Sequence, residues 1–174
     1  MPDVIRGLSI TPADLSDVES LYLLIHAAYR GEATSNTWSV ESERARGERI
    51  GRRALVALVA DKSKLLSTAR FAGKVIGASL VETDGAAQCA ISLLSVDPSF
   101  QGKGVGDKLL ACAETAAATH FSASSVLIEV LSLQPRLIQY YRRRGYELTG
   151  KSRPYPPRLS GGAELLTLEK FSQG

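Results

Sequence analysis

The chain has little cysteine, no long apolar run and a small net charge, and each shortage excludes a class of protein. Its 174 residues contain two cysteines, Cys89 and Cys112, which lack metal-ligand spacing even with the two histidines, so no metal is expected. We predict that both cysteines are reduced core residues, with a disulfide as the weaker alternative. No apolar run approaches the roughly 18 residues of a membrane span, and the N-terminus does not read as a secretory signal. A cytoplasmic protein without a membrane partner is expected.

The net charge of +3 is too small to indicate nucleic-acid binding. Basic residues nevertheless gather near the C-terminal end, where a solvated helix face and attraction of a polyanionic ligand are competing explanations. No aromatic-basic motif accompanies them, so nucleic acid is not an expected partner. The cluster consists of Arg136, Arg142, Arg143, Arg144, Lys151, Arg153 and Arg158.

What the chain does have is a glycine-rich segment between a predicted strand and a predicted helix. Gly102, Gly104 and Gly106 occupy alternate positions after Asp97-Pro98. The first turn of a helix leaves its N–H groups unpaired at the positive end of the helix dipole, which favours phosphate. Three glycines in five residues cost chain entropy that a plain turn does not require. We therefore expect a diphosphate-bearing ligand at residues 101–107.

Three phosphate-loop patterns compete for this segment. The P-loop pattern fails, because Gly104 follows Gly102-Lys103 where Ser or Thr is required. A dinucleotide fingerprint has Asp107 at its third glycine position, with Glu129 as a candidate ribose acid, so this alternative is weakened but stays open. The third pattern is Gln/Arg-x-x-Gly-x-Gly/Ala, and residues 101–106 fit it without substitution.

Periodicity and turn signals divide the chain into alternating elements. Strands are expected over 4–10, 64–71, 75–83, 88–96, 125–130, 146–149 and 164–171. Helices are expected from Thr11-Pro12 to Tyr29 and over 39–49, 52–60, 105–120 and 134–144, with loops over 31–36 and 153–162. A crossover helix separates 88–96 from 125–130, so these two strands should be parallel and the preceding three-strand meander antiparallel. We expect one domain over residues 1–174.

Residues 101–106 resemble the coenzyme A pyrophosphate loop of the GNAT-superfamily N-acetyltransferases. Residues 134–146 resemble that superfamily's last helix, with matches at Tyr141, Gly145 and Tyr146. Gln134 stands where Asn is usual, and Leu137 stands where Ala is usual. The element order also matches nearly the whole chain. The resemblance implies an α/β (α+β) fold: a mixed, mostly antiparallel sheet with one parallel strand pair, flanked by helices.

The resemblance implies acetyl-CoA as cosubstrate and assigns residues to it. Backbone N–H groups of Leu94 to Val96 would stabilise the oxyanion, and Tyr141, with Tyr140 as its rival, would protonate the departing thiolate. The implied coenzyme-binding residues are Leu94, Ser95, Val96, Gln101, Gly102, Lys103, Gly104, Val105, Gly106, Asp107, Gln134 and Tyr141.

Segments upstream resemble a subgroup of small GNAT proteins that carry Trp-Thr-Thr-Glu and Gly-Gln-Arg. The matching segments here are Tyr29-Arg30-Gly31, Trp38-Ser39-Val40-Glu41 and Gly47-Glu48-Arg49. Such segments border the acceptor groove, so Tyr29, Trp38, Glu41 and Arg49 are the implied substrate-binding residues. A flat apolar wall and an acid favour a small cationic amine as acceptor, although Trp38 could equally anchor the core.

The general base is open between several residues. A base or water chain must take the proton of the attacking amine, and Glu82, Glu129 and Glu41 are the acidic candidates. His26 has a suitable pKa range but falls in an apolar helix pattern, where a structural role is expected. Neither cysteine lies in the glycine loop, so the expected route is direct attack in a ternary complex. A non-catalytic acetyl-CoA-binding module and a NAD- or nucleotide-binding domain are the alternatives, and a homodimer is left open.

Overall fold

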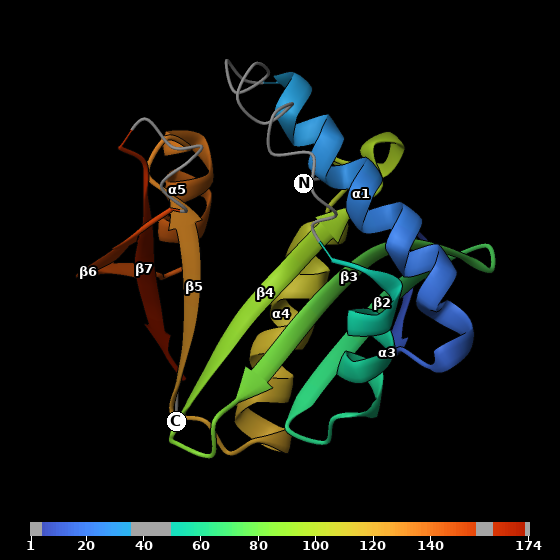
Figure 1. Cartoon of the computed structure of the whole chain (residues 1–174), viewed down its shortest axis with the longest axis horizontal. Coiled ribbons are helices and arrows are strands. Elements are labelled where there is room, and N and C mark those ends of the chain that lie inside the picture. The colour runs from blue at the N-terminus through green and yellow to red at the C-terminus, as the bar shows by residue number, and fades with distance from the viewer. Residues whose placement is uncertain (1–4, 36–49, 156–161, 173–174) are drawn as a thin grey trace.

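Seven strands form one sheet in the computed structural model, which describes residues 5–35, 50–155 and 162–172 (Figure 1). For residues 29–35 only the backbone is described. The strands are β1 (Ser9–Pro12), β2 (Lys64–Phe71), β3 (Lys74–Thr83), β4 (Gln88–Val96), β5 (Ser125–Leu131), β6 (Glu147–Pro154) and β7 (Glu164–Phe171). The helices are α1 (Val18–Ser35), α3 (Arg52–Ala60), α4 (Val105–His120) and α5 (Pro135–Arg142), with short 3₁₀ turns η1 (Leu15–Asp17) and η2 (Pro98–Phe100).

The strand order is β1-β2-β3-β4-β5-β7-β6. Every neighbouring pair is antiparallel except β4 and β5. The single parallel pair spans α4, as the crossover helix predicts. The predicted mixed sheet is therefore confirmed, and a doubly wound parallel sheet, which the dinucleotide alternative needs, is not what forms.

Helices cover both faces of the sheet, and alternating residues of β3 show which face each helix covers. Leu80 packs in one cluster with Leu21 of α1 and Leu55 of α3. Val81, pointing the other way, packs in a second cluster with Leu110 of α4 and with Tyr141 of α5. Thus α1 and α3 lie on one face, and α4 and α5 lie on the other (Figure 1).

A close approach between β3 and α4 fixes the position of the glycine loop. A Cβ atom on Gly77 would lie 2.7 Å from Leu109 Cδ1 and 3.2 Å from the Ser95 carbonyl oxygen. Only glycine therefore lets α4 pack this closely on the sheet. Val105, 1% exposed, anchors the start of α4 against Ile76 in the same region.

The boundary predictions near the N-terminus are wrong in three places. The strand expected over 4–10 begins only at Ser9, because residues 5–8 form a turn that the Leu8 N–H closes by donating to the Ile5 carbonyl oxygen. Pro12 ends β1 instead of opening a helix, because β1 is an edge strand, where proline is tolerated. The helix cap is Asp14, which accepts from the Ser16 N–H at 2.7 Å. Helix α1 continues through the predicted loop at 31–35, because one glycine costs about 1 kcal/mol and does not end a helix rich in good formers.

Two further predictions need correction. Strand β6 extends to Pro154 instead of ending at Thr149, because its backbone keeps pairing with β7 beyond a bulge. Cys112 is exposed on α4, whereas Cys89 is buried as predicted, and both are free thiols. The buried stripe of α4 follows four-residue steps from Val105 to Ala117, and Cys112 falls outside it.

A bulge in β4 interrupts its pairing with β3. Leu93 adopts a positive φ of 50°, and the β3–β4 register shifts so that Ala78 faces Ser95 while Leu80 faces Ser92. On its other side, β4 pairs with β5 only from Gln88 to Ala90. Beyond these three pairs the strands diverge, as Figure 1 shows.

Candidate active site

The glycine loop lies where β4 ends and α4 begins. Asp97 opens it as the cap of η2, accepting from the Ser99 N–H at 2.9 Å. Gly102 and Gly104 have φ values of 72° and 79°, a region that other L-residues rarely adopt. Gly104 is the N-cap of α4 and makes no side-chain cap. These two glycines are required by the backbone path itself.

Gly106 requires a different explanation. It lies inside the first turn of α4, and a Cβ atom there would lie 3.7 Å from Tyr140 Oη and 3.7 Å from Val96 Cγ2. Both distances are ordinary van der Waals contacts, so the chain itself would accept a side chain here. A helical glycine is less favourable than alanine by about 1 kcal/mol. The absence of a side chain at Gly106 is therefore explained if a ligand approaches the backbone closely at this position.

The backbone donors of this loop point to an anion. Among the described residues, no acceptor is present for the N–H groups of residues 102–107, whereas Gln101 N–H donates to Pro98 and Lys108 N–H to Gly104. These six consecutive donors coincide with the positive end of the α4 dipole. The arrangement can bind a pyrophosphate through main-chain hydrogen bonds.

The side chains around the loop are mostly polar and exposed. The Gln101 amide donates to the Val96 carbonyl oxygen at 3.3 Å, and Lys103 Nζ lies 5.1 Å from the centroid of the Phe100 ring. The Val105 side chain is buried in the core, so only the backbone of Val105 could contact a coenzyme. Lys103 leaves an exposed cation beside the donors.

Leu94, Ser95 and Val96 lie at the end of β4, where β4 no longer pairs with β5. Ser95 and Val96 pair with β3 on one side, at Ala78 and Gly77. On the β5 side their backbone has no ladder partner among the described strands. Main-chain groups on this edge are thus available where β4 and β5 diverge, which is the arrangement that an oxyanion site needs.

Helix α5 carries the two candidate tyrosines. Gln134 is its N-cap residue, and Tyr141 is 5% exposed among the core residues beneath α5. The Tyr141 ring meets the Tyr140 and Tyr146 rings edge-on, at centroid distances of 5.2 and 5.6 Å. The two neighbouring tyrosines therefore have different surroundings, as a rotation of about 100° per residue requires.

The Tyr140 hydroxyl is engaged in a hydrogen bond. It donates to Asp107 Oδ1 at 2.6 Å. Burial, together with this hydrogen bond, raises the pKa of Tyr140 well above its ordinary value of 10. Tyr140 thus already donates its proton to Asp107, which makes it a poor candidate for the acid that protonates the thiolate.

The acidic candidates are held in ion pairs. Glu82 lies on β3 opposite Ala90, the last β4 residue that pairs with β5, and its carboxylate accepts from Lys64. Glu129 lies on β5 two residues beyond Leu127, the last residue paired with β4. It is exposed and receives two hydrogen bonds from Arg153, at 2.7 and 2.6 Å. Glu82 and Glu129 are therefore both ion-paired acids close to the point where the strands separate.

His26 connects α1 to Ile50, which lies two residues before α3. Its Nε2 lies 3.2 Å from the Ile50 carbonyl oxygen, and its ring centroid is 4.5 Å from that of Tyr22. These contacts agree with a structural role. Tyr29 belongs to α1, but its side chain is not described. Trp38, Glu41 and Arg49, and the helix expected over 39–49, lie outside the described residues.

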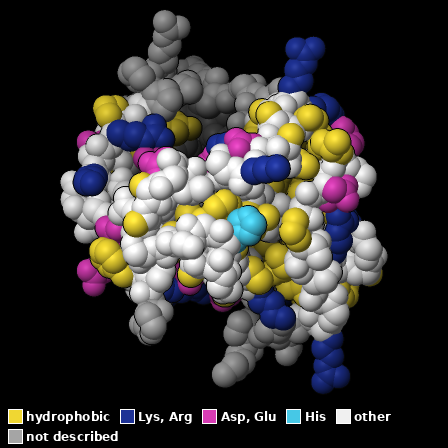
Figure 2. Space-filling model, turned by 90° about the horizontal axis from the view of Figure 1, so that it is seen from below, with side chains coloured by type: hydrophobic (Ala, Val, Ile, Leu, Met, Phe, Trp, Pro, Cys, Tyr) yellow, Lys and Arg dark blue, Asp and Glu magenta, His cyan; other side chains and the backbone are white. Residues whose placement is uncertain are grey.

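The basic cluster divides into paired and exposed members. Arg144 pairs with Asp107 and Arg153 with Glu129, whereas Arg142 and Arg143 are exposed. On the face shown in Figure 2, Lys and Arg side chains of the coloured part alternate with Asp and Glu instead of forming one patch. The four-residue spacing of Tyr140 and Arg144 on one helix face could have predicted their stacking, but no local signal indicates the Arg144–Asp107 pair.

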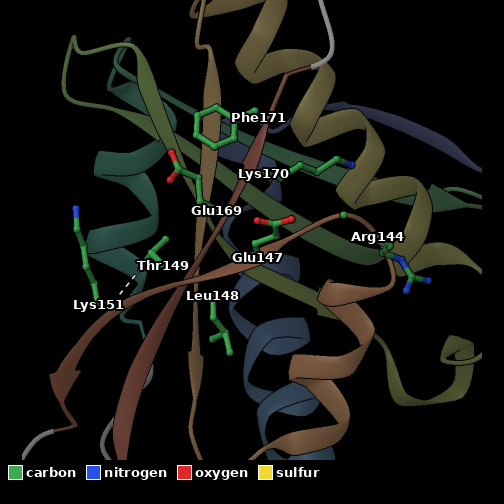
Figure 3. A pocket seen from close by; sticks show the side chains of 9 residues that line it. Arg144, Glu147, Leu148, Thr149, Lys151, Glu169, Lys170 and Phe171 are labelled. Atoms are coloured by element: carbon green, nitrogen blue, oxygen red, sulfur yellow. Dashed lines mark hydrogen bonds between the residues drawn. The ribbon is translucent and has the colours of Figure 1, made fainter.

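A hollow of about 700 Å³ lies elsewhere, along β6, β7 and the end of α5 (Figure 3). It shares no residue with the glycine loop. Its lining residues are Arg144, Gly145, Glu147, Leu148, Thr149, Lys151, Glu169, Lys170 and Phe171. Within the ranges that the structure describes, no group of three His, Cys, Asp or Glu side chains could hold a metal ion, and no helix is long and apolar enough to cross a membrane.

Comparisons with known proteins agree with this geometry. The model of the acetyltransferase (GNAT) family matches residues 18–146. The PaiA N-acetyltransferase from Thermoplasma acidophilum, solved with coenzyme A, has a TM-score of 0.76 at 15% identity, over 96% of this chain and 100% of that chain. The ribosomal-protein-S18-alanine N-acetyltransferase from Escherichia coli has a TM-score of 0.74 at 15% identity, over 96% of each chain. YncA from Salmonella typhimurium, solved with acetyl-CoA, has a TM-score of 0.72 at 17% identity, over 97% and 96% of the two chains. The search of curated proteins finds no match.

Proposed function

Because this chain belongs to the GNAT family of acetyltransferases and is an acyltransferase, we propose that it moves the acetyl group of acetyl-CoA to a primary amine of a small molecule. The observation that carries the proposal is the row of N–H groups at residues 102–107, at the start of α4, for which the described part of the chain offers no acceptor. Two of the structural neighbours were solved with coenzyme A or acetyl-CoA. We further propose that residues 1–174 act as one domain in the cytoplasm.

In the proposed complex, the loop binds the pyrophosphate and the diverging strands receive the rest of the coenzyme. Residues 102–107 supply main-chain donors, with Gln101 and Lys103 at the rim. Leu94 to Val96 contribute the free edge of β4, and Gln134 contributes an amide at the start of α5. The exposed Arg142 and Arg143 add long-range attraction for a polyanion.

The chemistry is direct attack of the amine on the thioester. The neutral amine nitrogen forms a bond to the acetyl carbon, and the oxyanion is stabilised by N–H groups of residues 94–96. The carbon–sulfur bond then breaks, and Tyr141 donates a proton to the thiolate. A base takes the proton of the amine, and we propose Glu129, with Glu82 and a water chain as the other candidates. Neither cysteine adjoins the loop, since Cys89 is buried and Cys112 lies on the exposed side of α4.

The proposed acceptor is a small cationic amine. This rests on residue types in the segment 29–49, where Trp38 offers a flat apolar wall and Glu41 a partner for an ammonium group. Segments that connect regular elements on a rigid scaffold commonly carry substrate selection. Tyr29 and Arg49 complete the proposed acceptor set.

The experiment is a two-stage measurement on the full chain. Calorimetry with acetyl-CoA tests the coenzyme site, and a panel of amines is then screened for thiol release from acetyl-CoA. Binding together with turnover of at least one small amine is the expected result. Coenzyme binding without turnover of any amine or peptide would support the non-catalytic alternative instead.

A further inference from the structure

The first turn of α4 carries an acid among the donors proposed for the pyrophosphate. Asp107 is the third residue of α4, and its own N–H belongs to the unpartnered row. Its carboxylate is 42% exposed, so it is not hidden from a ligand at the loop. A bare carboxylate here would satisfy the positive end of the helix and repel a pyrophosphate. An acid at this position therefore opposes coenzyme binding unless another group neutralises it.

Arg144, which follows α5 closely, contacts Asp107 and is held in place by Tyr140. Its guanidinium pairs with the Asp107 carboxylate, and its Nη1 donates to the Tyr140 carbonyl oxygen at 3.0 Å. The guanidinium carbon lies 3.5 Å from the centroid of the Tyr140 ring, and the Tyr140 hydroxyl donates to the same carboxylate at 2.6 Å. Stacking and hydrogen bonding thus fix the cation beside one acid.

The neighbouring arginines provide a contrast on the same segment. Arg142 and Arg143 are exposed, and neither makes an ion pair with any described residue. The Arg144 side chain is 28% exposed. Of these three consecutive cations, Arg144 is the one directed at the coenzyme loop.

We propose that Arg144 is a positioning residue for acetyl-CoA, whose charge cancels that of Asp107 and so keeps the first turn of α4 receptive to the pyrophosphate. The proposal rests on the proposed function. It differs from a purely mechanical explanation, in which the pair only ties α5 to α4. The two explanations predict opposite effects when Asp107 loses its charge.

The test is a double-mutant cycle read by acetyl-CoA calorimetry at about 0.1 M salt. Arg144→Met should raise Kd about tenfold, which corresponds to ~1.4 kcal/mol and lies within the range for a charge at a helix N-terminus. Asp107→Asn should lower Kd several-fold, because the cation of Arg144 then faces the ligand alone. The double variant should return Kd to about the parent value.

Three controls accompany the cycle. Arg52→Met removes an equal charge that pairs with Glu19 and stacks on Tyr22, on the other face of the sheet, and should change Kd less than about twofold. Arg144→Lys keeps the positive charge but loses the planar guanidinium that stacks on Tyr140, and it should retain most of the affinity for acetyl-CoA. The third control is ionic strength. The difference in Kd between Arg144→Met and the double variant should become smaller at 1 M salt, where the Debye length falls to about 3 Å.

Several outcomes would overturn the proposal. If Asp107→Asn weakens binding as much as Arg144→Met, and the double variant is no better than either, the pair is a mechanical tie. A folded Arg144→Lys variant as weak as Arg144→Met would also refute the role of charge. A parent protein that binds no acetyl-CoA would overturn the proposed function and this inference together, whereas a binding parent with the wrong pattern overturns this inference alone.

Discussion

Replacing Gly106 with alanine should make the protein more stable and its coenzyme binding weaker. The added methyl group meets Tyr140 Oη and Val96 Cγ2 at 3.7 Å, so the folded chain accommodates it without displacement. Helix propensity favours alanine over glycine by about 0.5–1 kcal/mol. For a chain of this size, each kcal/mol corresponds to about 2–4 °C in Tm. Gly106→Ala should therefore raise Tm by about 1–4 °C.

The same methyl group stands in front of the donors at the start of α4. If it prevents one hydrogen bond from a main-chain N–H to the charged pyrophosphate, the loss is about 1.5–3 kcal/mol. Kd for acetyl-CoA should then rise on the order of 10- to 100-fold. Stability and affinity thus move in opposite directions, which a general folding defect cannot produce.

Thermal melts and calorimetry on the same preparations check both halves. Gly85→Ala is the matched control, since Gly85 has a φ of 87° in the β3–β4 hairpin, at the opposite end of β4 from the loop, and no neighbour within 4 Å of an added Cβ. It should lower Tm, because alanine is strained at that φ, and leave Kd unchanged. If Gly106→Ala binds acetyl-CoA as tightly as the parent, the pyrophosphate does not approach the backbone at this position.

Three further predictions concern the acid, the loop cap and the acceptor. Tyr141→Phe should lower kcat on the order of 10²–10⁴-fold and leave Kd for acetyl-CoA nearly unchanged. Tyr140→Phe is the control and should lower kcat far less. An unchanged kcat in Tyr141→Phe would show that Tyr141 is not the acid. Hydrogen bonds from Ser99 hold the pKa of Asp97 below its ordinary 3.8, so its stabilisation is present above that value and lost as pH falls through the lower folded pKa. Acid unfolding below about pH 4 should be less steep in Asp97→Asn, and identical acid limbs for both proteins would refute this role. Trp38→Ala and Glu41→Gln should raise the KM of the acceptor and leave that of acetyl-CoA nearly unchanged in bisubstrate kinetics, whereas equal losses for both substrates would indicate a folding defect.

The elements that sequence predicts well are those whose signals are local. The Asp84-Gly85 turn marks a hairpin by its chemistry, and Gly102 and Gly104 mark a backbone path that few other residues follow. The helix over Arg52–Ala60 and the strand over Glu164–Phe171 likewise have the predicted bounds. In each case the local pattern and the tertiary surroundings favour the same structure.

What sequence did not predict depends on contacts between distant residues. The bulge at Leu93 follows from how β4 pairs with β3, and nothing in the residue type of Leu93 indicates a positive φ. Asp107 and Arg144 are 37 positions apart, so their pairing needs the packing of α5 beside α4. The edge position that makes Pro12 acceptable as a strand residue is likewise a property of the sheet. The acceptor residues Trp38 and Glu41 stay predictions.

The short parallel pairing of β4 with β5 also divides the sheet in its dynamics. Three residue pairs join the half from β1 to β4 to the half from β5 to β7, whereas seven pairs join β5 to β7. Local openings follow the least supported hydrogen bonds, so amides on the β5-facing edge of β4 should exchange with solvent sooner than those bonded to β3. The two halves should therefore open and close as separate cooperative units. They remain connected through α4, where the Tyr146 hydroxyl, from the half that contains β5 to β7, donates a hydrogen bond to Glu114 Oε1 at 2.8 Å. A ligand between the diverging strands would couple these units, and slower amide exchange on both would be the sign of that coupling.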